Sequence, residues 1–410
     1  MSIYNNDKRQ IRILLWGAGT YLKDIIDDID GNRNEIIGIV DHSNRKKYST
    51  EKVGYTFYLP SQVKNLDYQK VVITAKRKEQ YQSIYNDCIK VGIDEKQIIW
   101  YWDTTEDDSI FRNRGERLLE IKKYKCRAEN APYELGVIST PKIHSSEEVL
   151  NRLINEHLSL CRFGDGEFEI IRGNERAWFQ QDDDDLAKRL KSVLRTKNDK
   201  IIVGIADNFG SLSKYTDQAA DAIRFYVSGD TREDIMYMLD STTWYGNAYV
   251  TRPYMMYEDK RHAKRIFHLY KKLWQDRSVC VVEGEKGRFG LGNDLLDNTN
   301  NIKRIPCPAA NAYGRYDEIY DAATKLDKDT LFLVSLGPAA TVLAYDLTMA
   351  GYQAIDIGQL DNEYDWYKMR VTSRVPIPGK MVAECRSEES ETSTIYDNIW
   401  KKQVIDYIIR

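Results

Sequence analysis

Two acidic side chains, Asp165 and Glu167, stand one residue apart in a glycine-flanked turn, RFGDGE over residues 162–167. The apolar run 158–161 that precedes them predicts a strand, so the acids would follow a strand end. Glycine permits a sharp turn and lets a ligand approach the backbone closely. Carboxylates at this spacing can point at one cation, and Mn²⁺ or Mg²⁺ prefers such oxygen ligands together with phosphate oxygens. We therefore predict a metal site at Asp165 and Glu167, with a solvated acidic turn as the alternative.

Basic side chains and anion-binding turns follow other apolar runs. Arg252 follows the run 248–251, and a glycine-rich loop after residues 279–282 carries Lys286 and Arg288. Arginine can hold a phosphate through two parallel hydrogen bonds. The segment 335–341 predicts a strand that runs into a helix with an early proline, which leaves helix N–H groups open to an anion. Together these features predict a diphosphate site beside the metal.

Acidic side chains also follow the apolar run 354–357, where Asp361 and Glu363 again stand one residue apart. Carboxylates beside a metal–diphosphate site can also act as general bases that deprotonate a reacting hydroxyl group. Asp361, Glu363 and Glu384 are the candidates, and the sequence does not choose among them. Of the three, Glu384 has the strongest case for a purely structural role, because it lies in a strand-like context.

Strands alternate with helices along most of the chain, which predicts an α/β protein with two Rossmann-like domains and mostly parallel sheets. Ligands of such folds bind beyond the carboxyl ends of the strands, where the residues above lie. The expected strands are 11–16, 36–40, 71–74, 98–100, 158–161, 201–204, 248–251, 279–282, 331–335 and 354–357. The expected units are an N-terminal domain (1–105), a connector (106–142), a catalytic domain (143–386) and a hinge with a terminal helix (387–410).

The N-terminal unit carries a weak dinucleotide-like pattern. Gly17 and Gly19 precede a helix, and Asp41 follows the next strand, but Leu22 stands where a third glycine would be. A bound nucleotide-like ligand and a plain scaffold both remain open. A nicotinamide-dependent sugar-nucleotide oxidoreductase is therefore one alternative function, although no Tyr-x-x-x-Lys pair lies near a plausible substrate site.

The composition of the 410-residue chain indicates a globular protein, with 42% hydrophobic and 30% charged residues. The net charge of −3 gives no bulk attraction to nucleic acid. No apolar run approaches the roughly 18 residues of a membrane span, and the first residues lack a signal-peptide pattern. The six scattered cysteines favour reduced thiols, and with these features we expect a cytoplasmic location.

The segment from about 145 to 386 resembles the GT-D fold glycosyltransferases, bacterial enzymes with an Asp-x-Glu metal motif. The motifs that carry the resemblance cover over half of the chain in the expected order: RFGDGE (162–167), TRPY (251–254), VEGEKGRFGLGNDL (282–295), CPAANAY (307–313), LGPAATVLAYDL (336–347) and DIGQLDNEY (356–364). One departure is Gln359, where we expect a histidine. Glutamine cannot accept a proton near neutral pH, so the details of donor or acceptor handling would differ.

The resemblance implies transfer of a hexose, glucose from UDP-glucose, to a glycan or glycoprotein acceptor in bacterial surface-glycan synthesis. It places Asp165 and Glu167 on the family's metal motif, with Mn²⁺ or Mg²⁺ as cofactor. Residues of the matching motifs then become the donor-binding candidates: Phe163, Gly164, Arg252, Lys286, Arg288, Asn293, Asn311, Gly337, Pro338 and Thr341. A non-catalytic partner of another glycosyltransferase is a further alternative, which the intact acidic pair disfavours.

The C-terminus shows a polar hinge at 386–393, followed by apolar residues at helical spacing, Ile395, Ile399, Trp400, Val404, Tyr407 and Ile408. One apolar stripe on a helix must pack against something. The stripe either packs on its own chain or joins two copies in a homodimer.

Overall fold

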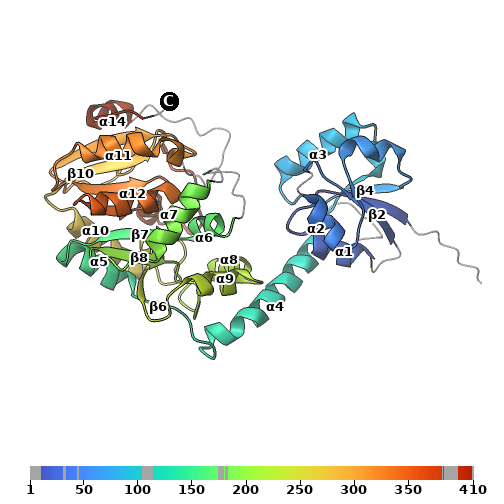
Figure 1. The fold of residues 1–410 in the computed structure, drawn as a ribbon, viewed down its shortest axis with the longest axis horizontal. Helices are drawn as coiled ribbons and strands as arrows, with labels where there is room; N and C mark the ends of the chain where they lie inside the picture. The colour runs from blue at the N-terminus through green and yellow to red at the C-terminus, as the bar shows by residue number, and fades with distance from the viewer. Residues whose placement is uncertain are drawn as a thin grey trace, which may run out of the picture. The chain divides into compact units, whose positions relative to one another are not determined.

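The computed structural model describes residues 11–30, 34–43, 46–103, 114–173, 180, 183–380, 382 and 396–408. The chain divides into two compact units, the first up to Lys125 and the second from Cys126. Each is built around its own parallel sheet (Figure 1). Within the described residues, no helix is long and apolar enough to cross a membrane.

The first unit is a five-stranded sheet in the order β3-β2-β1-β4-β5, with every neighbouring pair parallel. Its elements are β1 (Ile11–Trp16), α1 (Leu22–Asp30), β2 (Asn34–Val40), α2 (Lys47–Lys52), β3 (Phe57–Tyr58), η2 (Pro60–Asn65), β4 (Lys70–Ile73), α3 (Lys78–Lys90), η3 (Glu95–Gln97) and β5 (Ile98–Trp100). Helix α4 (Arg114–Glu134) follows, and the boundary between the units falls inside it.

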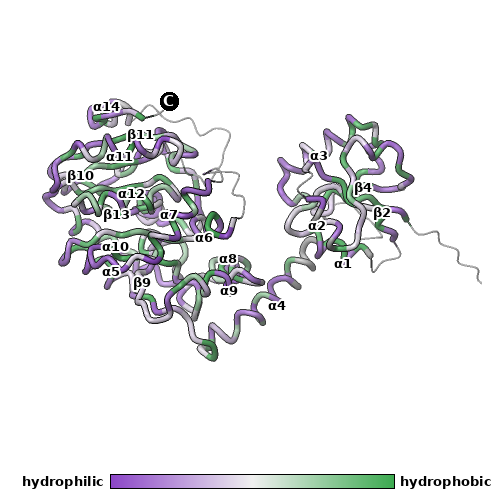
Figure 2. The backbone as a smooth tube through the Cα atoms, in the orientation of Figure 1, coloured by the Kyte–Doolittle hydropathy of each residue, from purple (hydrophilic) through white to green (hydrophobic). Residues whose placement is uncertain are grey.

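The second unit is an eight-stranded sheet in the order β11-β10-β12-β13-β7-β8-β9-β6, again parallel at every neighbouring pair. Its strands are β6 (Lys142–Ile143), β7 (Ser159–Phe163), β8 (Ile201–Ile205), β9 (Trp244–Asn247), β10 (Ser278–Gly284), β11 (Asn301–Cys307), β12 (Leu331–Ser335) and β13 (Gln353–Asp356). Figure 2 shows hydrophobic residues along these strands, as expected for a sheet covered on both faces.

Two helical layers bury the faces of this sheet. Core residues of α6 (Asp165–Ile171), α7 (Asp184–Leu194), α11 (Tyr316–Thr324) and α12 (Pro338–Met349) pack on one face. Residues of α5 (Ser146–Asn155), α10 (Arg261–Leu273) and α13 (Leu360–Met369) pack on the other. The remaining elements are α8 (Asp217–Val227), α9 (Thr231–Met238), η4 (Ala248–Thr251), η5 (Ala312–Arg315) and α14 (Asp397–Gln403).

The structure corrects two expectations about strands. Residues 248–251 form the 3₁₀ turn η4 and not a strand, because the Asn247 side chain accepts a hydrogen bond from the Tyr249 N–H (2.8 Å) and caps the turn. Strand β11 was not predicted. Its first half is polar and it contains Pro306, so its sequence does not alternate as a strand should.

The C-terminal segment packs on its own chain. Helix α14 is shorter than the predicted stripe, and Trp400 in it is 4% exposed. After the helix the chain runs beside β11, where the N–H groups of Ile405 and Ile408 donate to the carbonyls of Arg304 (3.0 Å) and Pro306 (2.9 Å). The segment therefore covers the edge of the sheet at β11, which would otherwise leave backbone groups unpaired.

Candidate active site

The Asp-x-Glu pair lies where β7 passes into α6. Gly164 caps the helix, and its N–H donates to Glu167 Oε2 at 2.8 Å. Asp165 is exposed, and its Oδ1 accepts a hydrogen bond from the Gly166 N–H at 3.1 Å. Both acids thus occupy the first turn of a helix, where the helix dipole favours negative charge. The predicted position of the pair at a strand end is confirmed.

In α/β proteins, ligands bind in the crevice beyond the carboxyl ends of the strands at a switch point of the sheet, and this strand end lies at such a point. Strands β7 and β13 are neighbours, but β7 leads into α6 on one face while β13 leads into α13 on the other. Two adjacent strands whose connections leave toward opposite faces open a gap beyond their carboxyl ends. The acidic pair therefore lies at the switch point of the sheet.

A buried ion pair spans the two strands below the crevice. The Arg162 guanidinium donates to Asp356 Oδ1 at 2.6 Å and to the Asp356 carbonyl at 2.8 Å. Gly358 leaves room for it, since a Cβ there would come within 2.3 Å of Arg162 Nη2. The Thr341 hydroxyl donates to the Arg162 carbonyl at 2.8 Å and so ties α12 to the same point.

The acids fit a divalent metal in their chemistry. Burial raises the pKa of Glu167 to about 7, and the nearby negative charge of Asp356 adds to the effect. A cation would relieve this cost by stabilising the carboxylate. Mg²⁺ and similar ions are commonly held by one or two carboxylates, with waters and substrate phosphates completing the shell. Among the described residues no three His, Cys, Asp or Glu side chains form a cluster that could hold a metal ion.

Of the three acids predicted as general bases, the structure describes Asp361 and Glu363, and both are buried and hydrogen-bonded. Asp361 is 5% exposed and accepts hydrogen bonds from Lys380 Nζ (2.6 Å) and Asn293 Nδ2 (2.8 Å). Glu363 is 1% exposed and accepts from the N–H groups of Tyr254 and Met255. These contacts are those of buried structural carboxylates, and burial raises the pKa of Glu363. Glu384 lies outside the described residues.

The predicted donor-binding residues of the β10–β11 connection lie on the same edge of the sheet, but farther from the acids. Three strand spacings separate β10 from β7, or roughly 14 Å at about 4.8 Å each. Lys286 is exposed, whereas Arg288 packs over the Trp400 ring at 4.4 Å. The Asn293 side-chain amide donates hydrogen bonds to Asp361 (2.8 Å) and to Asp365 (2.9 Å). Lys286 is thus the best placed of the three for a ligand.

Of the other donor-binding candidates, some lie at a strand end, and others are buried or hydrogen-bonded within the protein. Gly337, at φ +57°, and Pro338 form the turn into α12, two strand positions from β7. Thr341 is fully buried and already bonded to Arg162, and Phe163 is a core ring that offers only its backbone. Asn311 lies beyond β11, four positions from β7, where its Oδ1 accepts from Gln180 at 2.5 Å.

Arg252 and Gln359 lie closer to the crevice. Arg252 is half-buried at the end of η4, and its positive charge counteracts the raised pKa of Tyr249 and of Glu363. The negative charge of Asp165 acts on the same Tyr249, so Arg252 and Asp165 belong to one neighbourhood. Gln359 caps α13 immediately after the strand end at Asp356.

Three residues that sequence reasoning missed shape the site: Arg162, Asp356 and Asp207. Asp207 follows β8 at the position that Asp165 holds after β7, because Phe163 pairs with Ile205 in the register. In the sequence both acids follow closely after a predicted strand, so Asp207 could have been noted beside Asp165. The Arg162–Asp356 contact joins residues 194 positions apart and leaves no local signal.

Comparison with known proteins identifies the family. The model of the glycosyltransferase GT-D fold matches residues 160–385, which is more than half of the chain and includes both acids. The chain belongs to the GT-D glycosyltransferase family. A separate family model, described as C2185-like, N-terminal, matches residues 9–99.

Relatives of this GT-D protein come from streptococci. Glycosyltransferase GlyD of Streptococcus pneumoniae is 34% identical over 269 residues, 65% of this chain and 33% of the relative. The probable glycosyl transferase Gly of Streptococcus gordonii is 36% identical over 242 residues, 58% of this chain and 35% of the relative. The chain thus spans about a third of the length of these curated relatives.

Solved structures support the fold at similar identity. A glycosyltransferase from Streptococcus sanguinis is 32% identical with a TM-score of 0.59, and covers 66% of this chain and 100% of its own. Another structure, described as having a distinct glycosyltransferase fold, is 33% identical with a TM-score of 0.60, over 70% of this chain and 99% of its own. The GT-D membership is therefore carried by the second unit.

The N-terminal unit of this GT-D protein uses its dinucleotide-like residues internally. The Asp41 carboxylate accepts hydrogen bonds from the N–H groups of Ala18 (2.8 Å) and Ser43 (2.9 Å). In the dinucleotide fingerprint the corresponding acid binds a ribose hydroxyl, whereas here it accepts a hydrogen bond from the backbone of the glycine turn at Ala18. This geometry favours the scaffold interpretation, and the family membership disfavours the oxidoreductase alternative.

Proposed function

We propose that this protein is a metal-dependent hexosyltransferase that uses a nucleoside-diphosphate sugar, with UDP-glucose as the first candidate donor and Mn²⁺ or Mg²⁺ as the metal. The acceptor is a glycan or glycoprotein of a bacterial surface. The observation that carries the proposal is the position of Asp165 and Glu167 at the switch point between β7 and β13. Membership of the GT-D family supports it.

In this proposal the second unit binds and orients the donor. Asp165 and Glu167 would hold the metal, which when bound neutralises the negative charge on the diphosphate leaving group. The turn at Gly337 and Pro338 offers helix N–H groups to the diphosphate. The acceptor hydroxyl oxygen bonds to the anomeric carbon, the bond from that carbon to the diphosphate oxygen breaks, and the hydroxyl proton passes to a base. The nucleoside diphosphate leaves with the electron pair.

The proposal is tested by donor turnover with and without metal. Wild-type protein is incubated with UDP-, GDP- and dTDP-hexoses, and release of the nucleoside diphosphate is measured with Mn²⁺ and with a chelator. Asp165→Asn and Glu167→Gln should each reduce turnover by about 100-fold or more, the scale of removing one preorganised electrostatic contact. Glu169→Gln is the matched control, because Glu169 lies on the same helix but pairs with Arg172 at 3.0 Å.

The outcomes separate the hypotheses. Turnover that needs metal and both acids, but not Glu169, supports the proposal. Full Mn²⁺-dependent turnover by Asp165→Asn or Glu167→Gln would overturn the metal assignment. A folded wild-type protein that neither binds UDP with Mn²⁺ nor hydrolyses any donor would favour the non-catalytic partner.

A further inference from the structure

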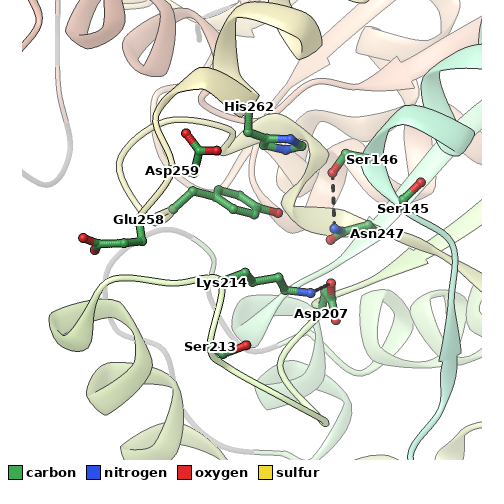
Figure 3. A pocket seen from close by; sticks show the side chains of 10 residues that line it. Ser145, Ser146, Asp207, Ser213, Lys214, Asn247, Glu258, Asp259 and His262 are labelled. Carbon is green, nitrogen blue, oxygen red and sulfur yellow. Dashed lines mark hydrogen bonds and ion pairs between the residues drawn. The ribbon is translucent and has the colours of Figure 1, made fainter.

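A polar pocket lies on the other side of β7 from the proposed donor crevice. It has a volume of about 490 Å³ and lies beyond the ends of β8 and β9 and beside the starts of α5 and α10 (Figure 3). Asp207 and Lys214 form an ion pair across it. This size falls within the range of small-ligand sites, roughly 300–1,000 Å³.

The pocket is a neighbour of the metal pair by strand register. Phe163 at the end of β7 pairs with Ile205 at the end of β8, and Ile205 pairs with Asn247 at the end of β9. Asp207 therefore follows the strand next to the one that leads into Asp165, and Asn247 ends the strand after that. Neighbouring strands in a sheet are about 4.8 Å apart, so the pocket lies one to two strand spacings from the strand that leads into the metal pair.

The lining of the pocket suits a neutral saccharide better than a second anion. Its charged lining residues are Asp207, Glu258, Asp259 and Lys214. Asp207 pairs with Lys214 and Asp259 with Arg261, so the pocket offers no excess positive charge to a diphosphate. Two of its polar groups hold each other in place, since Asn247 Nδ2 donates to Ser146 Oγ at 3.2 Å. Fixed donors and acceptors can select the hydroxyl groups of a sugar.

An aromatic wall completes the pocket. The Tyr257 and His262 rings lie 4.6 Å apart between centroids, at an interplanar angle of 39°, and both residues line the cavity. Burial lowers the pKa of His262, so its ring is neutral at physiological pH. Tyr257 is buried against His262, so the partly exposed His262 ring is the flat surface that could meet the C–H face of a sugar.

We propose that this pocket is the acceptor subsite, which binds the neutral saccharide whose hydroxyl group attacks the donor. The inference rests on the proposed transferase function. An attacking hydroxyl and a departing diphosphate need opposite sides of the anomeric carbon if the reaction inverts it. In the order of the strand ends, the diphosphate site proposed at Gly337, after β12, lies on one side of the metal pair. The pocket, beyond β8 and β9, lies on the other side.

The test uses the full-length protein with UDP-hexose, Mn²⁺ and a panel of p-nitrophenyl glycosides of glucose, galactose and N-acetylglucosamine. Two products are separated: free hexose from donor hydrolysis and elongated glycoside from transfer. Ser213→Trp fills the pocket mouth, and Lys214→Met removes its cation. Ser211→Trp is the matched control, because Ser211 lies in the same loop and its hydroxyl bonds that of Ser213 at 3.1 Å, but it does not line the pocket.

We expect at least one glycoside to accept hexose from the wild type with a saturable KM. Ser213→Trp and Lys214→Met should each raise that KM at least tenfold, while the affinity for UDP with Mn²⁺, measured by calorimetry, changes less than twofold. Ser211→Trp should keep the wild-type KM. An unchanged acceptor KM in both pocket variants, or active donor hydrolysis with no transfer to any glycoside, would overturn the subsite. Absence of donor turnover in the wild type would instead contradict the transferase function itself.

Discussion

Arg162 holds Asp356 through two hydrogen bonds, one to the side chain at 2.6 Å and one to the main-chain carbonyl at 2.8 Å. The two residues stand on the adjacent parallel strands β7 and β13. The pair therefore fixes the spacing of the two strand ends that form the crevice. It also places the negative charge of Asp356 near Glu167, which helps to raise the Glu167 pKa.

The first prediction concerns this pair. Arg162→Met leaves a buried carboxylate without its partner, and breaking such a pair costs about 3–5 kcal/mol. Arg162→Lys keeps the charge but cannot make both hydrogen bonds in the same geometry, so it should lose less stability. Urea denaturation followed by circular dichroism gives the shift in midpoint.

A matched control is Arg265→Met, since Arg265 pairs with Glu147 at 2.6 Å but is 70% exposed. That surface pair should contribute no more than about 1 kcal/mol. Equal destabilisation by Arg162→Met and Arg265→Met would contradict the structural role assigned to Arg162.

The second prediction concerns pH. Glu167 has a folded-state pKa of about 7, raised from 4.5, and a metal binds only its deprotonated form. Mn²⁺ affinity should therefore rise as pH increases from 5.5 to about 7.5 and then level off. The stability of the metal-free protein should change in the opposite direction to the Mn²⁺ affinity. The folded state binds the Glu167 proton more tightly than the unfolded state, so the free energy of unfolding should fall as pH rises from 4.5 through 7.

Calorimetric titration with Mn²⁺ at four pH values checks the affinity, and thermal melts of the metal-free protein check the stability. Glu167→Gln should bind Mn²⁺ weakly at every pH and should remove the part of the stability slope between pH 4.5 and 7 that Glu167 causes. A Glu167→Gln protein with the same slope as the wild type would show that another group is responsible.

The third prediction concerns the N-terminal unit. All residues assigned to donor and metal binding lie in the second unit, so a fragment without the first unit should still hydrolyse the donor. The second half of α4 must be retained, because Asn130 is 1% exposed and donates to Ser228 Oγ at 3.0 Å, and Glu134 pairs with Arg224 at 2.7 Å.

Two fragments test this division. The fragment 120–410 keeps these contacts and should melt as one cooperative unit with donor turnover within about threefold of the full chain. The fragment 136–410 removes them and should be less stable. A folded fragment 120–410 with no donor binding would show that the first unit takes part in the chemistry.

Parallel strands could be predicted from the sequence because most of them are short apolar runs that end in polar turns, as in 159–163 and 331–335. The Asp-x-Glu pair could be placed for the same reason, since its turn follows directly from the strand. Strand β11 could not, because its pairing with β10 compensates for a polar first half and a proline.

The roles of Asp361 and Glu363 depend on partners that the sequence does not reveal. Asp361 is held by Lys380, 19 positions later, and Glu363 by backbone N–H groups more than 100 positions earlier. Acids at i, i+2 after a strand looked equivalent to Asp165 and Glu167 in sequence. Only tertiary packing separates a buried, satisfied carboxylate from one that borders a crevice.

The last prediction concerns the C-terminal helix. Trp400 is 4% exposed and packs over Arg288, whereas Ile399 beside it is 53% exposed. Trp400→Glu places a charge in this buried contact, and loss of a buried tryptophan costs about 3–5 kcal/mol. Ile399→Glu should change stability by no more than about 0.5 kcal/mol.

Urea denaturation measures the stability of both variants, and light scattering at micromolar concentration measures the oligomeric state. If α14 packs only on its own chain, Trp400→Glu lowers stability and neither variant changes the molecular mass. A wild-type dimer that Ile399→Glu converts to a stable monomer would instead show that the exposed face of α14 joins two copies.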